Sequence, residues 1–375
     1  MAMSGAWSNK IMRQLLIFAL LFVVACSGSG KKGAATGIVA NSESSNAPRY
    51  VSGLKITAPL RKAVINQSSD IKVEWESSYP QNIDSVQVVY DNKLVVTLRG
   101  TETTTNIQSQ GKVGVRNVKL QAFYADGSTS VAVTPITVLP AKAERWSYRV
   151  KATYPHATSS FTQGLYYKDG FLYEGTGQYG TSALLKVEPQ SGKILSQVDL
   201  KRNYFGEGIT ALNGKIYQLT WTNGVCLVYN ESTMEQIAEY SYASQGWGLA
   251  TFGDKLIMSD GSNMLTVLNP ENFEQLYQVQ VYDNNGPVEQ LNELEYIDGY
   301  VWANVWQSDR VVVINPENGA VVADIDFSGL LTKEEQGRLD MLDHVLNGIA
   351  YNKDRGTYYI TGKCWPKLFE IELKK

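Results

Sequence analysis

Five stretches in the second half of the chain follow one pattern, and this repetition constrains the fold more than any other feature. Each stretch has a short apolar segment, a turn rich in Gly, Asp or Asn, and a second apolar segment; the stretches begin at Thr162, Gly206, Gly246, Leu291 and Leu346. A third apolar segment follows, and usually a fourth, so the repeat has a period of about 40–55 residues. Four strands at this period are typical of a β-propeller blade. The sequence therefore predicts an all-β protein with a five-bladed propeller over residues 145–375.

The last repeat stops after its third strand, at "LFEIELKK". The segment "WSYRVKATYPH" (146–156) precedes the first repeat and has the pattern of a strand. We expect residues around 148–154 to pair with residues around 367–373, because this pairing closes the ring and removes an exposed edge. The fourth repeat carries an insertion, 328–344, in which 331–342 reads as a short amphipathic helix with Thr332 near its start.

Residues 49–141 have a different pattern. Roughly seven short segments alternate apolar and polar residues and are separated by turn signals, as in "DIKVEWES" and "SVAVTPITVL". This length and spacing predict a small immunoglobulin-like β-sandwich. No acids, bases or metal ligands converge in it, so we interpret it as a spacer or an interaction module.

The first 26 residues resemble a bacterial lipoprotein signal. Lys10 and Arg13 precede an apolar run at 15–25 that is too short to span a bilayer, and Cys26 follows directly. The prediction is lipidation at Cys26, a flexible polar linker over 27–48, and an extracytoplasmic protein anchored to a bacterial membrane through its lipid alone. An ordinary signal peptide with a chance cysteine is the alternative.

Net charge and the numbers of cysteines and histidines limit which partners and cofactors we expect. A net charge of −3 gives no reason to expect nucleic acid as a partner. Beyond Cys26 the chain has two cysteines, Cys226 and Cys364, which can pair but which we expect to stay single. Its two histidines, His156 and His344, lie outside the aligned repeat positions described next, so we expect no catalytic zinc and no other cofactor.

A propeller gathers the starts of its innermost strands around one opening, so aligned repeat positions become neighbours in space. The first aligned position of the five repeats holds Gln163, Glu207, Trp247, Asn292 and Asn347. A second position, beyond the end of the second strand, holds Gly177, Trp221, Gly261, Trp306 and Lys363.

Glu207 is the one acid at these positions, and the indoles and Lys363 are predicted to surround it. Desolvation by indoles raises the pKa of a carboxyl group, whereas a nearby ammonium lowers it. A carboxyl group under both influences suits general acid/base catalysis near neutral pH. The alternative is a propeller without catalytic activity that binds peptide or glycan through its aromatic rim.

The motifs "FTQGL", "YFGEGIT", "YQLTW", "LNELE" and "ITGKCWPKLFEI" resemble the glutamine cyclotransferases of the plant and bacterial type. The resemblance covers about 145–375 and implies a metal-independent enzyme that converts N-terminal glutamine of peptides to pyroglutamate and releases ammonia. We also expect the protein to be a monomer. The resemblance implies that Glu207 shuttles the proton and that Lys363 and Asn292 assist. It also implies a substrate pocket made by Gln163, Phe161, Phe205, Trp221, Trp247 and Trp306, and the aligned repeat position adds Asn347 to the predicted substrate-binding residues.

Overall fold

The computed structural model describes residues 53–374. The predicted signal with Cys26 and the predicted linker 27–48 lie outside the described residues. Within the described part of the chain, no helix is long and apolar enough to cross a membrane.

The first part of the described chain is a β-sandwich of two sheets. The strands are β1 (Leu54–Ala58), β2 (Val64–Asn66), β3 (Asp70–Ser77), β4 (Ile83–Tyr90), β5 (Lys93–Arg99), β6 (Thr104–Gln108), β7 (Gly114–Tyr124) and β8 (Thr129–Leu139), with one 3₁₀ turn at Pro80–Asn82. One sheet has the order β1-β3-β6 and the other β2-β8-β7-β4-β5. Their facing apolar residues, among them Val73, Trp75 and Val88, form one core. The expected count of roughly seven strands was low by one, because β2 has three residues and is too short to show alternation.

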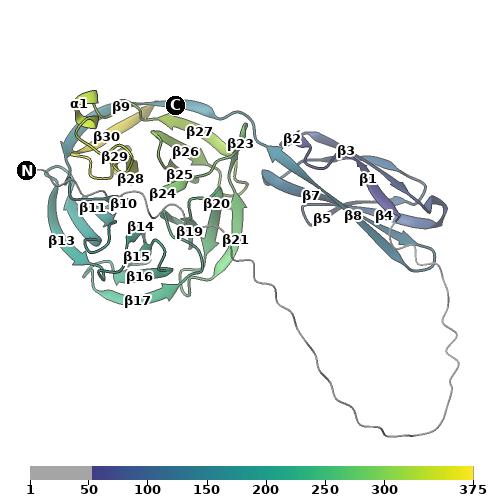
Figure 1. Cartoon of the computed structure of the whole chain (residues 1–375), viewed down its shortest axis with the longest axis horizontal. Helices are drawn as coiled ribbons and strands as arrows, with labels where there is room; N and C mark the ends of the chain where they lie inside the picture. The colour runs from purple at the N-terminus through teal and green to yellow at the C-terminus, as the bar shows by residue number, and fades with distance from the viewer. Residues whose placement is uncertain (1–52, 375) are drawn as a thin grey trace, which may run out of the picture. The chain divides into compact units, whose positions relative to one another are not determined.

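The second part is a five-bladed β-propeller, as predicted (Figure 1). The first three blades are β10 (Thr162–Lys168), β11 (Phe171–Thr176), β12 (Ala183–Glu188) and β13 (Lys193–Asp199); β14 (Gly206–Leu212), β15 (Lys215–Thr220), β16 (Val225–Asn230) and β17 (Gln236–Ser241); and β18 (Leu249–Phe252), β19 (Lys255–Ser259), β20 (Met264–Leu268) and β21 (Gln275–Gln280). The fourth blade is β24 (Leu291–Ile297), β25 (Tyr300–Val305), β26 (Arg310–Ile314) and β27 (Val321–Asp326), and a small hairpin of β22 (Tyr282–Asp283) and β23 (Gly286–Pro287) precedes it.

The fifth blade combines both ends of the propeller sequence. Its strands are β28 (Leu346–Asn352), β29 (Thr357–Gly362), β30 (Lys367–Lys374) and, on the outside, β9 (Glu144–Pro155). The predicted closure is confirmed, because β9 pairs antiparallel with β30 from Ser147–Lys374 through to Pro155–Lys367. The first residues of β9 also pair in parallel with Ala323–Ile325 of β27. Blades four and five therefore form one continuous sheet, which the repeat pattern did not predict.

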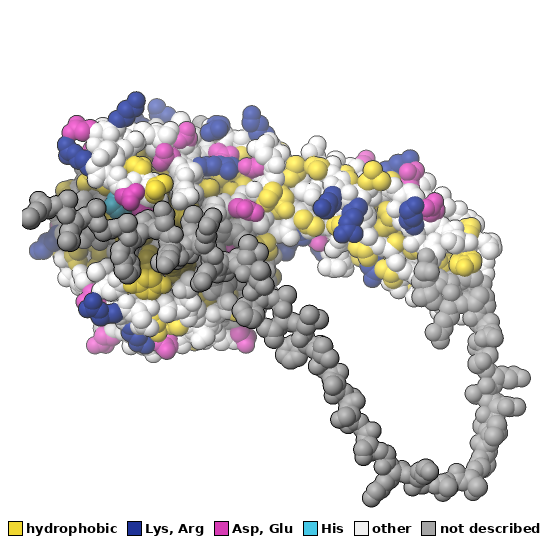
Figure 2. Space-filling model, viewed as in Figure 1, with side chains coloured by type: hydrophobic (Ala, Val, Ile, Leu, Met, Phe, Trp, Pro, Cys, Tyr) yellow, Lys and Arg dark blue, Asp and Glu magenta, His cyan; other side chains and the backbone are white. Residues whose placement is uncertain are grey.

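The innermost strands surround the centre of the ring, and the outermost strands face solvent (Figure 1). Strand β10 is buried over its first five residues, whereas β13 is exposed along most of its length. Positive and negative side chains are interspersed over the face that Figure 2 shows, rather than gathered in a single patch of one sign.

The predicted helix over 331–342 was too long. Helix α1 spans only Lys333–Gln336, with Thr332 as its N-cap and a capping box formed with Glu335. Gly337 follows at the C-cap, where its low helix propensity favours the end of the helix. The rest of the insertion runs as turns towards the start of β28, and this path brings Asp343 to the mouth of the propeller channel.

Candidate active site

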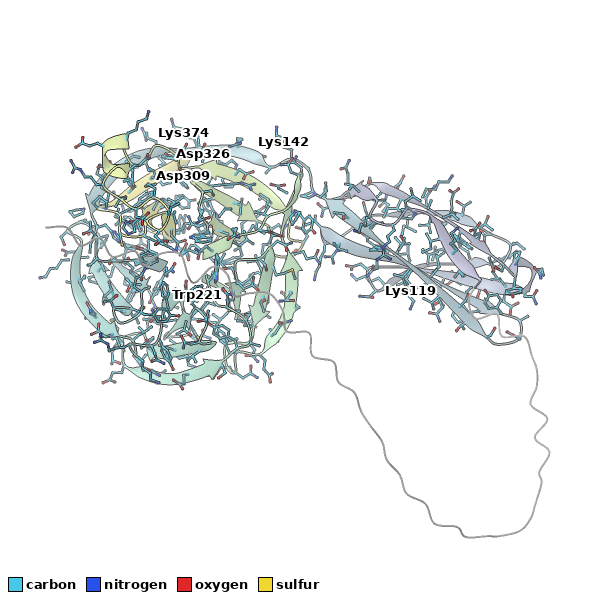
Figure 3. All side chains as sticks on the ribbon, viewed as in Figure 1. Lys119, Lys142, Trp221, Asp309, Asp326 and Lys374 are labelled. Carbon is cyan, nitrogen blue, oxygen red and sulfur yellow. The ribbon has the colours of Figure 1, made fainter. Side chains whose placement is uncertain are left out.

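One mouth of the channel holds a cavity of about 320 Å³. Its lining residues are Phe161, Gln163, Gln178, Phe205, Glu207, Trp221, Trp247, Asn292, Trp306, Asp343 and Lys363. The structure thus brings together all the predicted site residues of the propeller except Asn347. Figure 3 places Trp221 near the middle of the ring, whereas Lys142 and Lys374 lie at its outer edge.

Glu207 stands between two glycines because the backbone on either side of it is packed against neighbouring blades. A Cβ atom on Gly206 would lie 2.5 Å from the Thr176 carbonyl oxygen, and one on Gly208 would lie 2.6 Å from the Trp247 carbonyl oxygen. These distances are far below van der Waals contact, so both positions require glycine. The glycines let the backbone that carries Glu207 approach blades one and three closely, and this packing fixes the position of the carboxylate.

The Glu207 carboxylate lies almost entirely out of solvent, at 4% exposure. Burial raises its pKa well above the usual range, and the positive charge of Lys363 opposes that rise. Gln163 Nε2 donates a hydrogen bond to Glu207 Oε1 at 3.1 Å. A carboxyl group with a raised pKa can hold or release a proton near neutral pH, which is the property that acid/base catalysis needs.

Lys363 lies in the turn after β29 and is 5% exposed. Its Nζ stands 4.9 Å from the centre of the Phe161 ring, which gives the ammonium a cation–π partner. Burial lowers the pKa of Lys363, and the carboxylates of Glu207 and Asp343 act in the opposite direction. The cavity therefore contains a desolvated acid and a desolvated base that stabilise each other's charged forms.

Aromatic rings form the walls of the cavity in two groups. Phe205 makes edge contacts with Phe161 at 6.0 Å and with Trp221 at 5.7 Å between ring centres. On the other side, Trp247 and Trp306 are 5.5 Å apart and nearly perpendicular. Such edge-to-face contacts are favourable and hold the rings in defined orientations.

The glycines of the second aligned position make room for these rings. A Cβ atom on Gly177 would lie 2.4 Å from the Phe205 ring, and one on Gly261 would lie 2.6 Å from the Trp247 ring. Gln245 adds a further constraint, because its Oε1 accepts hydrogen bonds from the indole nitrogens of both Trp221, at 2.7 Å, and Trp247, at 3.1 Å. Gln245 was not predicted, since it lies outside the aligned positions.

Asn292 and Asn347 have different surroundings. Asn292 is 2% exposed and lines the cavity, and its Oδ1 has no hydrogen-bond partner among the described residues. Asn347, in contrast, does not line the cavity. Asn347 is fully buried and donates through Nδ2 to the Thr162 carbonyl oxygen at 3.0 Å and to Gln163 Oε1 at 3.2 Å. Gln163 stands between Asn347 and Glu207, so Asn347 acts on the cavity through Gln163.

Two lining residues were not predicted. Gln178 has a positive φ of 89° directly after Gly177, and Asp343 belongs to the insertion in the fourth repeat. Neither occupies an aligned position, so the repeat pattern carried no signal for them. Cys226 and Cys364 are both free, as expected. Residues 53–374 contain no group of three His, Cys, Asp or Glu side chains arranged to hold a metal ion.

Comparison with known proteins places these features in context. A family model described as glutamine cyclotransferase matches residues 120–373. A glutaminyl-peptide cyclotransferase from Arabidopsis thaliana is 39% identical over 232 residues, which are 60% of this chain and 71% of the relative. The crystal structure of Myxococcus xanthus glutaminyl cyclase superposes with a TM-score of 0.59 at 37% identity and covers 62% of this chain and 99% of that one.

Proposed function

Because the chain belongs to the glutamine cyclotransferase family, we propose that it converts the N-terminal glutamine of peptides and proteins to pyroglutamate with release of ammonia, and that Glu207 moves the proton. The observation that carries this proposal is the position of Glu207. Its buried carboxyl group lies in a cavity walled by aromatic rings, next to Lys363 and the amides of Gln163 and Asn292.

The reaction forms a bond between the α-nitrogen and the side-chain carbonyl carbon of glutamine, and it breaks the bond from that carbon to the amide nitrogen. The α-amine must lose a proton as it attacks, and the departing nitrogen must gain one to leave as ammonia. Glu207 can accept the first proton and deliver the second, so the carboxylate ends the cycle in its starting form.

The other groups of the cavity suit the remaining requirements of the reaction, which are substrate binding, charge stabilisation and proximity of the reacting atoms. The free Oδ1 of Asn292 is an acceptor suited to an N–H of the substrate. The Lys363 ammonium is suited to stabilise the negative charge that develops on the carbonyl oxygen. The aromatic walls can hold the glutamine side chain folded towards its own amine, which supplies the proximity that an intramolecular reaction needs.

A binding module without catalytic activity is not favoured. An aromatic cavity alone fits peptide or glycan binding, but binding gives no reason to bury an acid with a raised pKa beside a lysine.

The test is ammonia release from a peptide that begins with glutamine. Glu207→Gln keeps the size of the side chain but cannot ionise, so turnover should fall by roughly 10²–10⁴ while peptide binding persists. Glu231→Gln is a matched control, because Glu231 is also largely buried, at 10% side-chain exposure, and pairs with a lysine, Lys168, but does not line this cavity. Ammonia release by Glu207→Gln at the rate of the control would contradict the assigned role.

We also propose that the enzyme acts outside the cytoplasm as a lipid-anchored monomer. The support is the sequence alone: the charged residues, the apolar run and Cys26 stand in the order of a lipoprotein signal.

A further inference from the structure

His156 and Glu174 form a buried pair next to the turn that carries Lys363. His156 directly follows β9, and Glu174 belongs to β11 of the first blade. His156 Nε2 lies 3.2 Å from Glu174 Oε1, and the side chains are 6% and 3% exposed. On its other side, His156 Nδ1 lies 2.7 Å from the carbonyl oxygen of Trp365. The pair lines no part of the cavity, and the proton transfers proposed above do not use it.

The partners of His156 determine its protonation. A carbonyl oxygen and a carboxylate oxygen are both acceptors, and a neutral imidazole has only one N–H to donate. Thr162 Oγ1 also donates a hydrogen bond to Glu174 Oε1 at 2.7 Å, so this oxygen acts as an acceptor. Both contacts of His156 are therefore satisfied together when the ring carries two protons and Glu174 carries none.

The turn after β29 is held by hydrogen bonds from several directions. Lys363 N donates to the Val345 carbonyl oxygen at 2.9 Å, and Cys364 N donates to the Ser160 carbonyl oxygen at 2.8 Å. The backbone N–H of His156 donates to the Pro366 carbonyl oxygen at 3.1 Å. His156 thus holds this turn through its ring at Trp365 and through its backbone at Pro366, two and three residues beyond Lys363.

We propose that His156 and Glu174 are positioning residues for Lys363: doubly protonated His156 ties the turn at Trp365 to the first blade, and loss of its proton at alkaline pH removes one of the two ring contacts and lets Lys363 shift relative to Glu207. This inference rests on the proposed role of Lys363 in the reaction.

The charged groups around the pair determine whether the pKa of His156 is raised or lowered. Burial by itself lowers the pKa of His156, but the Glu174 carboxylate and the two hydrogen bonds of the ring raise it above its usual value. On the turn, Lys363 and Cys364 stand near the pair, and Asp343 of the insertion faces Lys363. A raised histidine pKa means that the contact is complete below that pKa and is lost as the pH rises through it.

Nuclear magnetic resonance of the imidazole nitrogens tests this in the unmodified protein. The chain has two histidines, so the spectrum of His344→Asn assigns both signals. We expect His156 to be doubly protonated at pH 7, and we expect its deprotonation to coincide with the alkaline fall of kcat/KM for a glutamine peptide. A neutral His156 ring at a pH where kcat/KM is maximal would overturn the inference.

Glu174→Gln gives a second, independent readout. It removes the charge that raises the pKa of His156, so the alkaline limb of the kcat/KM profile should move to lower pH. Glu370→Gln is the matched control, because Glu370 is also fully buried and paired with a cation, Arg355, but it lies away from the cavity. An alkaline limb at the same pH in Glu174→Gln and in the control would refute the positioning role. Absence of ammonia release by the unmodified chain would refute the proposed function instead, and the nitrogen signals would still report the state of the pair.

Discussion

The side-chain amide of Gln163 lies between two partners, and its nitrogen donates to Glu207 Oε1 at 3.1 Å. Its oxygen receives a hydrogen bond from Asn347 Nδ2 at 3.2 Å. A primary amide has a donor end and an acceptor end. Asn347 therefore determines that the donor end of Gln163 faces the carboxylate.

The first prediction follows from this chain of amides. Asn347→Ala removes the donor that orients Gln163, so kcat/KM should fall about tenfold, the effect of one lost hydrogen bond. Gln163→Ala combined with Asn347→Ala should cost no more than Gln163→Ala alone, because the second change acts through the first. Additive losses in this double-mutant cycle would mean that Asn347 acts by another route.

The charge of Lys363 should be visible in the acidic limb of the pH profile. The ammonium lowers the pKa of Glu207, so Lys363→Met should let that pKa rise. If the reaction requires ionised Glu207 as the base, the acidic limb of kcat/KM should then move to higher pH. Lys367→Met, a change at a lysine paired with Glu335 outside the cavity, should leave the limb in place. A shift to lower pH in Lys363→Met would contradict the coupling.

Trp306 should contribute mainly to binding. Its ring forms a wall that contacts ground state and transition state alike, so Trp306→Ala should raise KM more than it lowers kcat. Tyr300→Ala is a control on β25, the strand that ends just before Trp306, because Tyr300 is 37% exposed and does not line the cavity. A change confined to kcat would instead indicate that the indole acts only in the transition state.

Strand β9 should decide the stability of the propeller. Removing residues 1–143 leaves β9 whole, whereas removing 1–158 deletes it and exposes the edges of β27 and β30. The longer deletion should lower Tm by more than 10 °C, because it destroys two strand pairings of a closed ring. Equal Tm values in thermal unfolding would show that β9 does not close the ring.

Lipidation can be tested by one substitution, at Cys26. If Cys26 carries the lipid, Cys26→Ser should move the protein from the membrane fraction to the soluble fraction and block cleavage before residue 26. The ammonia-release activity of the soluble protein should be unchanged. Unaltered membrane partitioning and signal cleavage in Cys26→Ser would contradict lipidation at this residue.

The sequence predicted the ring and most of the cavity because a propeller converts repeat position into spatial position. Glu207, Trp221 and Trp306 lie around one opening. The innermost strand of each blade starts at this opening, and the antiparallel second strand ends there. Phe161 and Phe205 precede aligned positions and were found through the family resemblance alone. The orientations of these two side chains depend on contacts between aromatic rings, and the repeat alignment does not predict such contacts.

The features that the sequence did not predict depend on contacts that repeat alignment does not contain. Asn347 holds an aligned position, yet Gln163 of the neighbouring blade stands between it and the cavity. Asp343 reaches the cavity from an insertion that has no counterpart in the other repeats. His156 was considered only as a metal ligand, whereas its role depends on a carbonyl group more than two hundred residues away in the sequence.

Strand β9 also has a consequence for the synthesis of the protein. Arg149 of β9 pairs with Glu372 of β30 across 223 residues of sequence. At about 5–20 residues per second, a ribosome makes the partner roughly 10–45 seconds after β9 itself. During that interval β9 lacks its main partner β30, and only residues 144–146 can pair earlier, with β27. Strands with open edges recruit other chains. Folding in the cell therefore depends on keeping β9 apart from neighbouring polypeptides until the last strand has left the ribosome.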